Sequence, residues 1–65
     1  MEFDEERAGL ISGAIGMAVV NLIAFSVPIN RDNLVEELER VRRETGNVIG
    51  KGANRDAAEI VRKGM

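Results

Sequence analysis

The chain has 65 residues, a formal net charge of −2, and no cysteine, histidine or tyrosine. Its length allows one domain, predicted over residues 1–65, whose core alone supplies only about 3–5 kcal/mol of stability. The missing residue types exclude disulfides, the commonest metal ligands and any catalytic role for cysteine, histidine or tyrosine. We therefore expect no enzyme activity, no metal site and no cofactor, and we expect a chain that gains stability by self-association.

A run of residues without charge, from Ala8 to Asn30, separates an acidic start from a densely charged remainder. A run of this length has to be covered by a bilayer, by the protein's own core or by a partner. Because Pro28 disfavours helical geometry in the residue before it, the pattern predicts a first helix over about residues 4–26. The acidic cluster that begins at Asp4 suits the positive end of that helix.

The residues of this first helix divide into two faces when they are placed at steps of about 100°. One face is bulky and is predicted to be core, and it contains Ile11, Ile15, Ala18, Leu22 and Phe25. The opposite face is nearly smooth and is predicted to be a homodimer interface, and it contains Gly9, Gly13, Gly16, Val20 and Ala24. Each glycine lowers helix stability by roughly 1 kcal/mol relative to alanine, and the close approach of a second backbone would account for that cost.

A second helix is predicted over about residues 31–45. Asn30 is a typical N-cap residue, and Gly46 suits the end of a helix. The apolar stripe of this helix is predicted to complete the core, and it contains Leu34, Leu38 and Val41. The acidic and basic residues on its other face are interpreted as a solvated surface, including the cluster Glu36, Glu37 and Glu39.

The segment after the second helix allows two interpretations. Asn54 caps a short helix that follows a loop over residues 46–53, or Asn47 caps a longer third helix over about residues 47–63. The longer helix is favoured because it places Ile49 and Ile60 on one apolar face, and both are predicted to be core. The predicted fold is therefore all-α, with two to three helices per chain forming a small bundle that is completed by homodimerisation.

The glycines of residues 46–52 look at first like a phosphate-binding loop. The segment has one residue too few between its glycines, and Gly52 stands where the Mg²⁺-binding hydroxyl is needed. No β-strand is predicted before it. Nucleotide binding is therefore not predicted.

Two other functions remain open as alternatives. The charge-free run is long enough for a single membrane-spanning helix over residues 8–29, although Asn21 and Pro28 are unfavourable in a bilayer. Arg42, Arg43 and other basic residues would allow weak DNA binding of the kind found in nucleoid-associated transcription regulators. The interleaved acids reduce the charge offered to phosphates, so a soluble homodimer is favoured over both.

From Ile15 to the C-terminus the sequence resembles the AriR/YmgB family of small enterobacterial regulators. The resemblance is carried by Ile15-Gly16-Met-Ala18-Val19-Val-Asn21-Leu22, then Ile29-Asn30-Arg-Asp-Asn33-Leu34, Leu38 and Glu44-Thr45, and finally Glu59-Ile60-Val61. It implies an all-α, dimeric, cytoplasmic protein that influences biofilm formation and acid resistance. The chain departs from the family pattern at Pro28, Gly46, Gly50 and Gly52.

Members of that family act as connectors that feed signals into two-component phosphorelays. The resemblance therefore implies a cytoplasmic regulator that binds a second copy of itself and another regulatory or signalling protein. Direct contact with DNA or with a membrane is possible in such a protein and is not favoured here.

Overall fold

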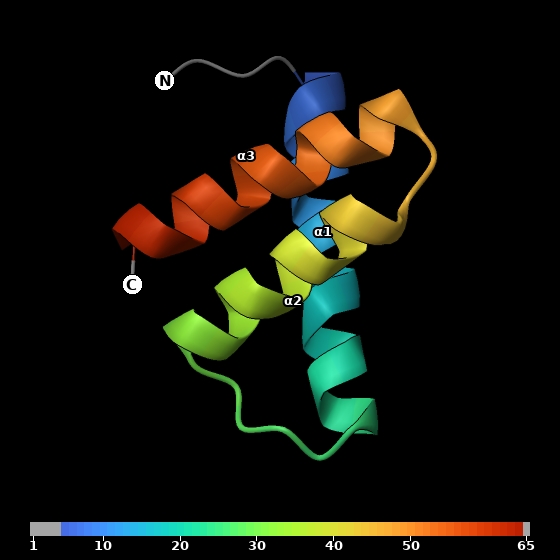
Figure 1. The fold of residues 1–65 in the computed structure, drawn as a ribbon. Coiled ribbons are helices and arrows are strands. Elements are labelled where there is room, and N and C mark those ends of the chain that lie inside the picture. Colours follow the sequence, from blue (N-terminus) through green and yellow to red (C-terminus); the bar gives the residue numbers. More distant parts are fainter. Residues whose placement is uncertain (1–4, 65) are drawn as a thin grey trace.

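The computed structural model describes residues 5–64, and within that range the chain folds into three α-helices (Figure 1). Helix α1 is Glu5–Ala24, helix α2 is Arg31–Glu44 and helix α3 is Val48–Gly64. The fold is all-α, as the sequence predicts, and the three helices pack into one small bundle. The predicted start of the first helix at Asp4 lies outside the described residues.

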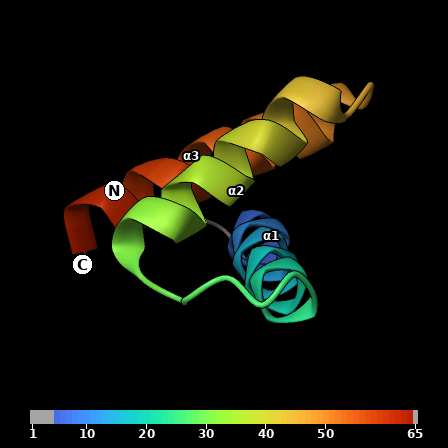
Figure 2. The ribbon, with the colours of Figure 1, turned by 60° about the horizontal axis from the view of Figure 1, so that its bottom comes forward.

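Helices α2 and α3 form an antiparallel pair, and α1 lies across the face that they share (Figure 2). The connection between Glu44 and Val48 is only three residues long, so α3 has to turn back along α2. Each of the three helices contacts both of the others. The pair therefore provides a surface on which α1 buries one side.

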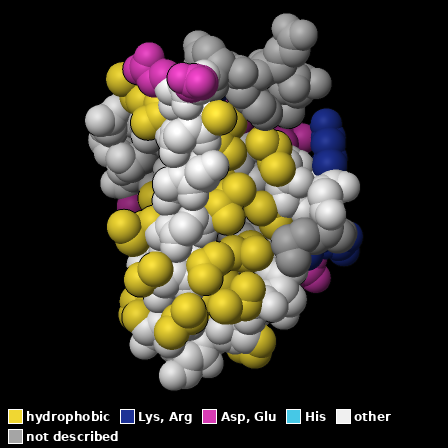
Figure 3. All heavy atoms as spheres, turned by 180° about the vertical axis from the view of Figure 1, so that it is seen from behind, with side chains coloured by type: hydrophobic (Ala, Val, Ile, Leu, Met, Phe, Trp, Pro, Cys, Tyr) yellow, Lys and Arg dark blue, Asp and Glu magenta, His cyan; other side chains and the backbone are white. Residues whose placement is uncertain are grey.

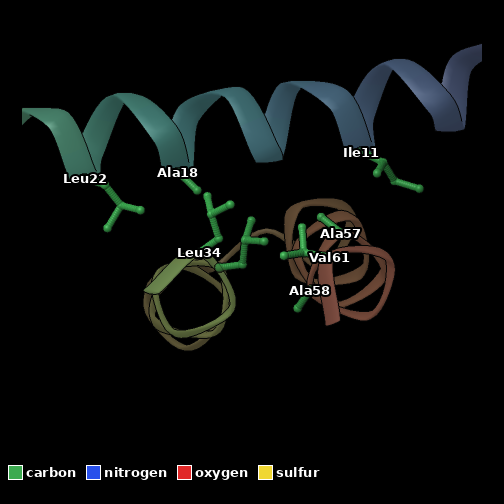
Figure 4. Close-up of a cluster of buried hydrophobic side chains, with 8 residues drawn as sticks. Ile11, Ala18, Leu22, Leu34, Ala57, Ala58 and Val61 are labelled. Atoms are coloured by element: carbon green, nitrogen blue, oxygen red, sulfur yellow. The ribbon is translucent and has the colours of Figure 1, made fainter. Parts of the chain in front are cut away.

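The core lies where α1 meets the α2–α3 pair (Figure 4). Helix α1 buries Ile11, Ala18 and Leu22, whose spacing places them on one stripe of the helix. The facing side chains of the other two helices are Leu34, Leu38, Ala57, Ala58 and Val61. Because α3 contributes mostly alanine here, its backbone can lie close to the larger side chains of α1 and α2.

Phe25 is predicted to belong to the core, and this prediction is wrong because its side chain is 68% exposed. Helix α1 ends at Ala24, two residues before its predicted end, and Leu22 is its last buried residue. Phe25 lies in the turn that follows, past the end of the core. Ile15, on the predicted bulky face, is half-buried and packs against the edge of the core.

Ile49 is also predicted to be core, and this prediction is wrong because Ile49 is 64% exposed. The buried stripe of α3 is turned by about one residue from the predicted one. It consists of Ala53, Asn54, Ala57, Ala58 and Val61. This rotation leaves Ile60 half-buried at the edge of the core, and Val41 of α2 is half-buried too.

Helix α1 ends in a Schellman motif whose left-handed residue is Ser26, with a φ of 56°. The Val27 N–H donates to the carbonyl of Leu22 at 2.9 Å, and the Ser26 N–H donates to the carbonyl of Ile23 at 3.1 Å. Val27 then packs against the core, and Pro28 prevents the helix from continuing. The chain is thereby turned back toward α2.

Helix α2 begins at an asparagine cap, as the sequence predicts. The side-chain oxygen of Asn30 accepts a hydrogen bond from the N–H of Asn33 at 2.8 Å. The side-chain amide of Asn33 donates in turn to the carbonyl of Pro28 at 2.8 Å. These two bonds fix the direction in which α2 leaves the turn.

Helix α3 begins at Val48, so the longer of the two helices predicted for this segment is the one that forms. The side-chain oxygen of Asn47 accepts from the N–H groups of Ile49 at 2.8 Å and Gly50 at 3.3 Å. Asn54 lies inside the helix, where its side chain donates to the carbonyl of Gly50 at 2.8 Å. Asn47 therefore caps α3, and Asn54 satisfies a backbone carbonyl within it.

We expect the substitution Ser26→Gly to raise the free energy of unfolding by about 0.5–1 kcal/mol. A left-handed conformation costs an L-residue roughly 1–2 kcal/mol, and glycine avoids this cost while losing some entropy on folding. Urea denaturation measures the change. The matched control is Ser12→Gly within α1, which should lower stability by about 0.5 kcal/mol. Equal losses in both variants would contradict the assignment of the Schellman motif.

Candidate interaction surface

One side of α1 is left uncovered by the other helices. Only 17% of the residues in its most apolar 18-residue window are buried. We call the exposed side the outer face, and it consists of Gly9, Leu10, Gly13, Gly16, Met17, Val20, Ile23 and Ala24. Its large side chains are between 42% and 63% exposed. Viewed from behind, hydrophobic side chains gather on this side of the molecule (Figure 3).

The predicted homodimer residues all lie exposed on the outer face, and they are Gly9, Gly13, Gly16, Val20 and Ala24. A Cβ atom added to any of the three glycines would meet no neighbouring atom within 4 Å. The glycines therefore have no packing role within a single chain. Since each lowers helix stability by roughly 1 kcal/mol relative to alanine, nothing in the chain itself offsets their cost.

A buried carboxylate joins the inner side of α1 to α2. Glu37 is only 7% exposed. Its carboxylate accepts a hydrogen bond from the Asn21 side-chain amide of α1 at 2.9 Å, and one from the Nε of Arg40 at 2.8 Å. Arg40 also pairs with Glu44 one turn further along α2. The charge of Glu37 is thus paired and hydrogen-bonded, as a buried charge must be.

The hydrogen bonds from Arg40 hold the pKa of Glu37 below its ordinary value of 4.5. Burial opposes this shift, and the hydrogen bond from Asn21 adds to it. The same pairing raises the pKa of Arg40 above its ordinary value. Both side chains therefore remain charged at neutral pH.

Glu37 is predicted to belong to a solvated surface, and this prediction is wrong because the side chain is buried against Asn21. A signal for this contact exists in the sequence. Glu37 follows Leu34 by three positions and therefore lies on the apolar side of α2. Asn21 occupies the middle of the charge-free run, where its amide needs a partner.

A groove of about 200 Å³ lies beside this contact, and it is lined by both acidic and basic side chains of α2. Within residues 5–64, no buried side-chain nitrogen or oxygen lacks a hydrogen-bond partner. In the same range, no cluster of three or more acidic residues is placed to hold a metal ion. The polar side chains buried beside this groove therefore already have hydrogen-bond partners within the protein.

Known proteins provide no indication of what the outer face binds. Comparison with known proteins found no matching family model, no matching curated protein and no matching solved structure. Helix α1 is long and apolar enough to cross a membrane, and core helices of soluble proteins and signal sequences share these properties. The outer face is therefore interpreted from its exposure and its glycines.

We expect Glu37→Gln to lower the free energy of unfolding by about 1–3 kcal/mol at neutral pH, because a charged hydrogen-bonded pair is lost. The lowered pKa of Glu37 contributes stability that is present above its ordinary value of 4.5. That contribution disappears as the pH falls below this value. Urea denaturation at several pH values should show the two proteins converging in acid. A constant difference at every pH would contradict the pairing.

Proposed function

We propose that this chain is a small regulatory protein that acts through protein–protein contact, and that its working form is a homodimer. The observation that carries the proposal is the outer face of α1. Large apolar side chains on this face are exposed, and three glycines among them contact nothing in their own chain. Packing against the α1 helix of a second copy would bury the apolar side chains, and the glycines would let the two helices approach closely.

Glycine allows two helix backbones to approach closely, and the larger side chains beside it then pack around the contact. Full burial of a large aliphatic side chain gains about 1.5–3 kcal/mol, so a half-exposed one gains roughly 1 kcal/mol. A stable interface removes about 800 Å² from each partner. That area is roughly a fifth of the 4421 Å² of accessible surface, so the interface would cover a large part of one side of the molecule.

The resemblance to the AriR/YmgB family supports a role for this dimer. We propose that it works in the cytoplasm as a connector that feeds signals into a two-component phosphorelay, with effects on biofilm formation and acid resistance. Its second partner would be another regulatory or signalling protein. The proposal includes no enzyme activity, because the chain has no cysteine, histidine or tyrosine from which a catalytic site could be built.

A single-span membrane protein, with residues 8–29 in the bilayer, is the second candidate, because α1 has the required length and composition. Such a helix would have to leave the core formed by its inner stripe. It would also separate Asn21 from the carboxylate of Glu37, which would leave a buried charge with one partner fewer. These contacts favour the dimer.

Weak DNA binding of the nucleoid-associated kind is less well supported. Arg40, Arg42 and Arg62 each form an ion pair with a glutamate. Affinity for a phosphate backbone rises with the number of phosphates that basic side chains neutralise. Paired arginines therefore contribute little to it.

We expect the protein to sediment as a dimer in detergent-free buffer, and Gly13→Leu to convert it into a monomer. The added side chain prevents close approach between the helices, and overpacking of this kind costs about 1–3 kcal/mol. The same substitution raises helix propensity, and a Cβ atom at this position meets no neighbouring atom within 4 Å, so the monomer should stay folded. Sedimentation equilibrium and circular dichroism measure the two effects.

The matched control is Ala8→Leu, which adds a leucine to α1 outside the outer face and should leave the dimer intact. A Gly13→Leu protein that remains a dimer would show that the outer face is not the interface. Recovery of the protein only in detergent would support the membrane candidate. Binding to an arbitrary DNA duplex that weakens steeply with salt would support the DNA candidate.

A further inference from the structure

The outer face of α1 changes in height along the helix. Its first half is smooth along the middle, because Gly9, Gly13 and Gly16 leave bare backbone there. Its second half carries larger side chains, since Val20 is 58% exposed and Ile23 is 63% exposed. The face therefore consists of a shallow half followed by a raised half.

The outer face runs from Gly9 to Ala24, so its midpoint lies between Gly16 and Met17. A twofold axis through this midpoint, in the plane of the interface and perpendicular to α1, makes a second α1 antiparallel to the first. The two outer faces then overlap along their whole length, and the raised half of each copy lies on the shallow half of the other. A parallel pair would place the two raised halves against each other, and the helices could not pack to the density of a protein interior along their whole length.

The antiparallel arrangement also matches individual large and small residues. At about 100° per residue, each large side chain has a small residue on its own side of the face, at nearly the same distance from the midpoint in the other direction. The twofold axis brings these residues together across the interface. The facing pairs are Val20 with Gly13, Leu10 with Ala24, and Ile23 with Gly9. At the midpoint, the two Gly16 residues allow the backbones to cross closely, and the two Met17 side chains pack beside them.

The charges at the start of α1 favour the same direction. Glu5 and Glu6 are exposed in the first turn, whereas Arg7 of this turn pairs with Asp56 of α3. A parallel pair would bring the acids of the two copies within about 10 Å, the distance between packed helix axes. An antiparallel pair separates them by about 30 Å, well beyond the Debye length of about 8 Å. Each acidic turn then lies beside residues 25–30 of the other copy, which carry no charged side chain.

We infer that the outer face binds a second copy of the chain in the antiparallel direction, with the twofold axis between Gly16 and Met17. The inference rests on the proposed function, and it adds the direction and the register of the two helices. The two α1 helices form the centre of this dimer, and the charged α2–α3 pairs form its two outer layers. Each pair stays accessible, so the dimer presents two identical surfaces to another protein.

Disulfide cross-linking tests the direction, because the chain has no cysteine of its own. Leu10→Cys and Ala24→Cys proteins are mixed under reducing conditions and then oxidised, and intact masses identify the products. We expect at least about tenfold more mixed dimer than either self-linked dimer, since a disulfide needs Cα atoms within about 7 Å. In the antiparallel dimer, two copies of the same position would be about 20 Å apart along the helix. The matched control is Met17→Cys, which lies at the midpoint and should link to itself in either direction.

A compensating substitution tests the register. Gly13→Val should weaken the dimer at least about tenfold, because the added side chain meets Val20 of the second copy. Adding Val20→Ala removes the opposing side chain and should restore most of that loss. The matched control is Ile23→Ala, which should restore none of it. All three substitutions raise helix propensity, so the monomer should stay folded, and sedimentation equilibrium measures the dimer Kd.

The inference is overturned if Leu10→Cys and Ala24→Cys each link mainly to themselves. That result would assign a parallel dimer and would leave the proposed function standing. The inference is also overturned if Val20→Ala and Ile23→Ala restore the Gly13→Val dimer equally. A protein that sediments as a monomer, without a cross-link through Met17→Cys, would contradict the proposed homodimer and the inference with it.

Discussion

The structure depends on one constraint. Helix α1 carries no charge after its first turn, and the other two helices cover only one of its sides. The α2–α3 pair is the only cover that residues 5–64 provide for α1, and it meets the stripe of Ile11, Ala18 and Leu22. The other side of the helix stays exposed because no further helix in this range can reach it. A small core gives only a few kcal/mol of stability, so apolar surface left in water matters more here than in a large protein.

The covered side of α1 is positioned by one polar contact as well as by packing. Glu37 lies among apolar side chains and is bonded to Asn21 on the neighbouring helix. A shift of α1 along the pair would separate these groups and leave a buried charge with an unfilled hydrogen bond. The contact therefore fixes which side of α1 faces the α2–α3 pair. The outer face, on the opposite side, is left exposed as a consequence.

The sequence predicts the helices well because their ends carry local signals. Asn30, Asn47 and Pro28 act within a few residues of themselves, so their effect can be read from spacing alone. The predictions for Phe25 and Ile49 are wrong because the burial of these residues depends on where a helix ends and how far it is turned. The pairing of Glu37 joins residues from different helices. Such a contact follows from packing between helices, which periodicity within one helix does not describe.

The most direct test of this account is an intermolecular relaxation measurement. Since the chain has no cysteine, Ser12→Cys provides a single site for a spin label at the edge of the outer face. Spin-labelled protein is mixed with isotope-labelled protein that carries no spin label. We expect the label to broaden the amide signals of Gly9, Gly13 and Gly16 in the other copy and to leave those on the charged side of α2 unchanged. Absence of intermolecular broadening at protein concentrations up to about 1 mM would contradict the account.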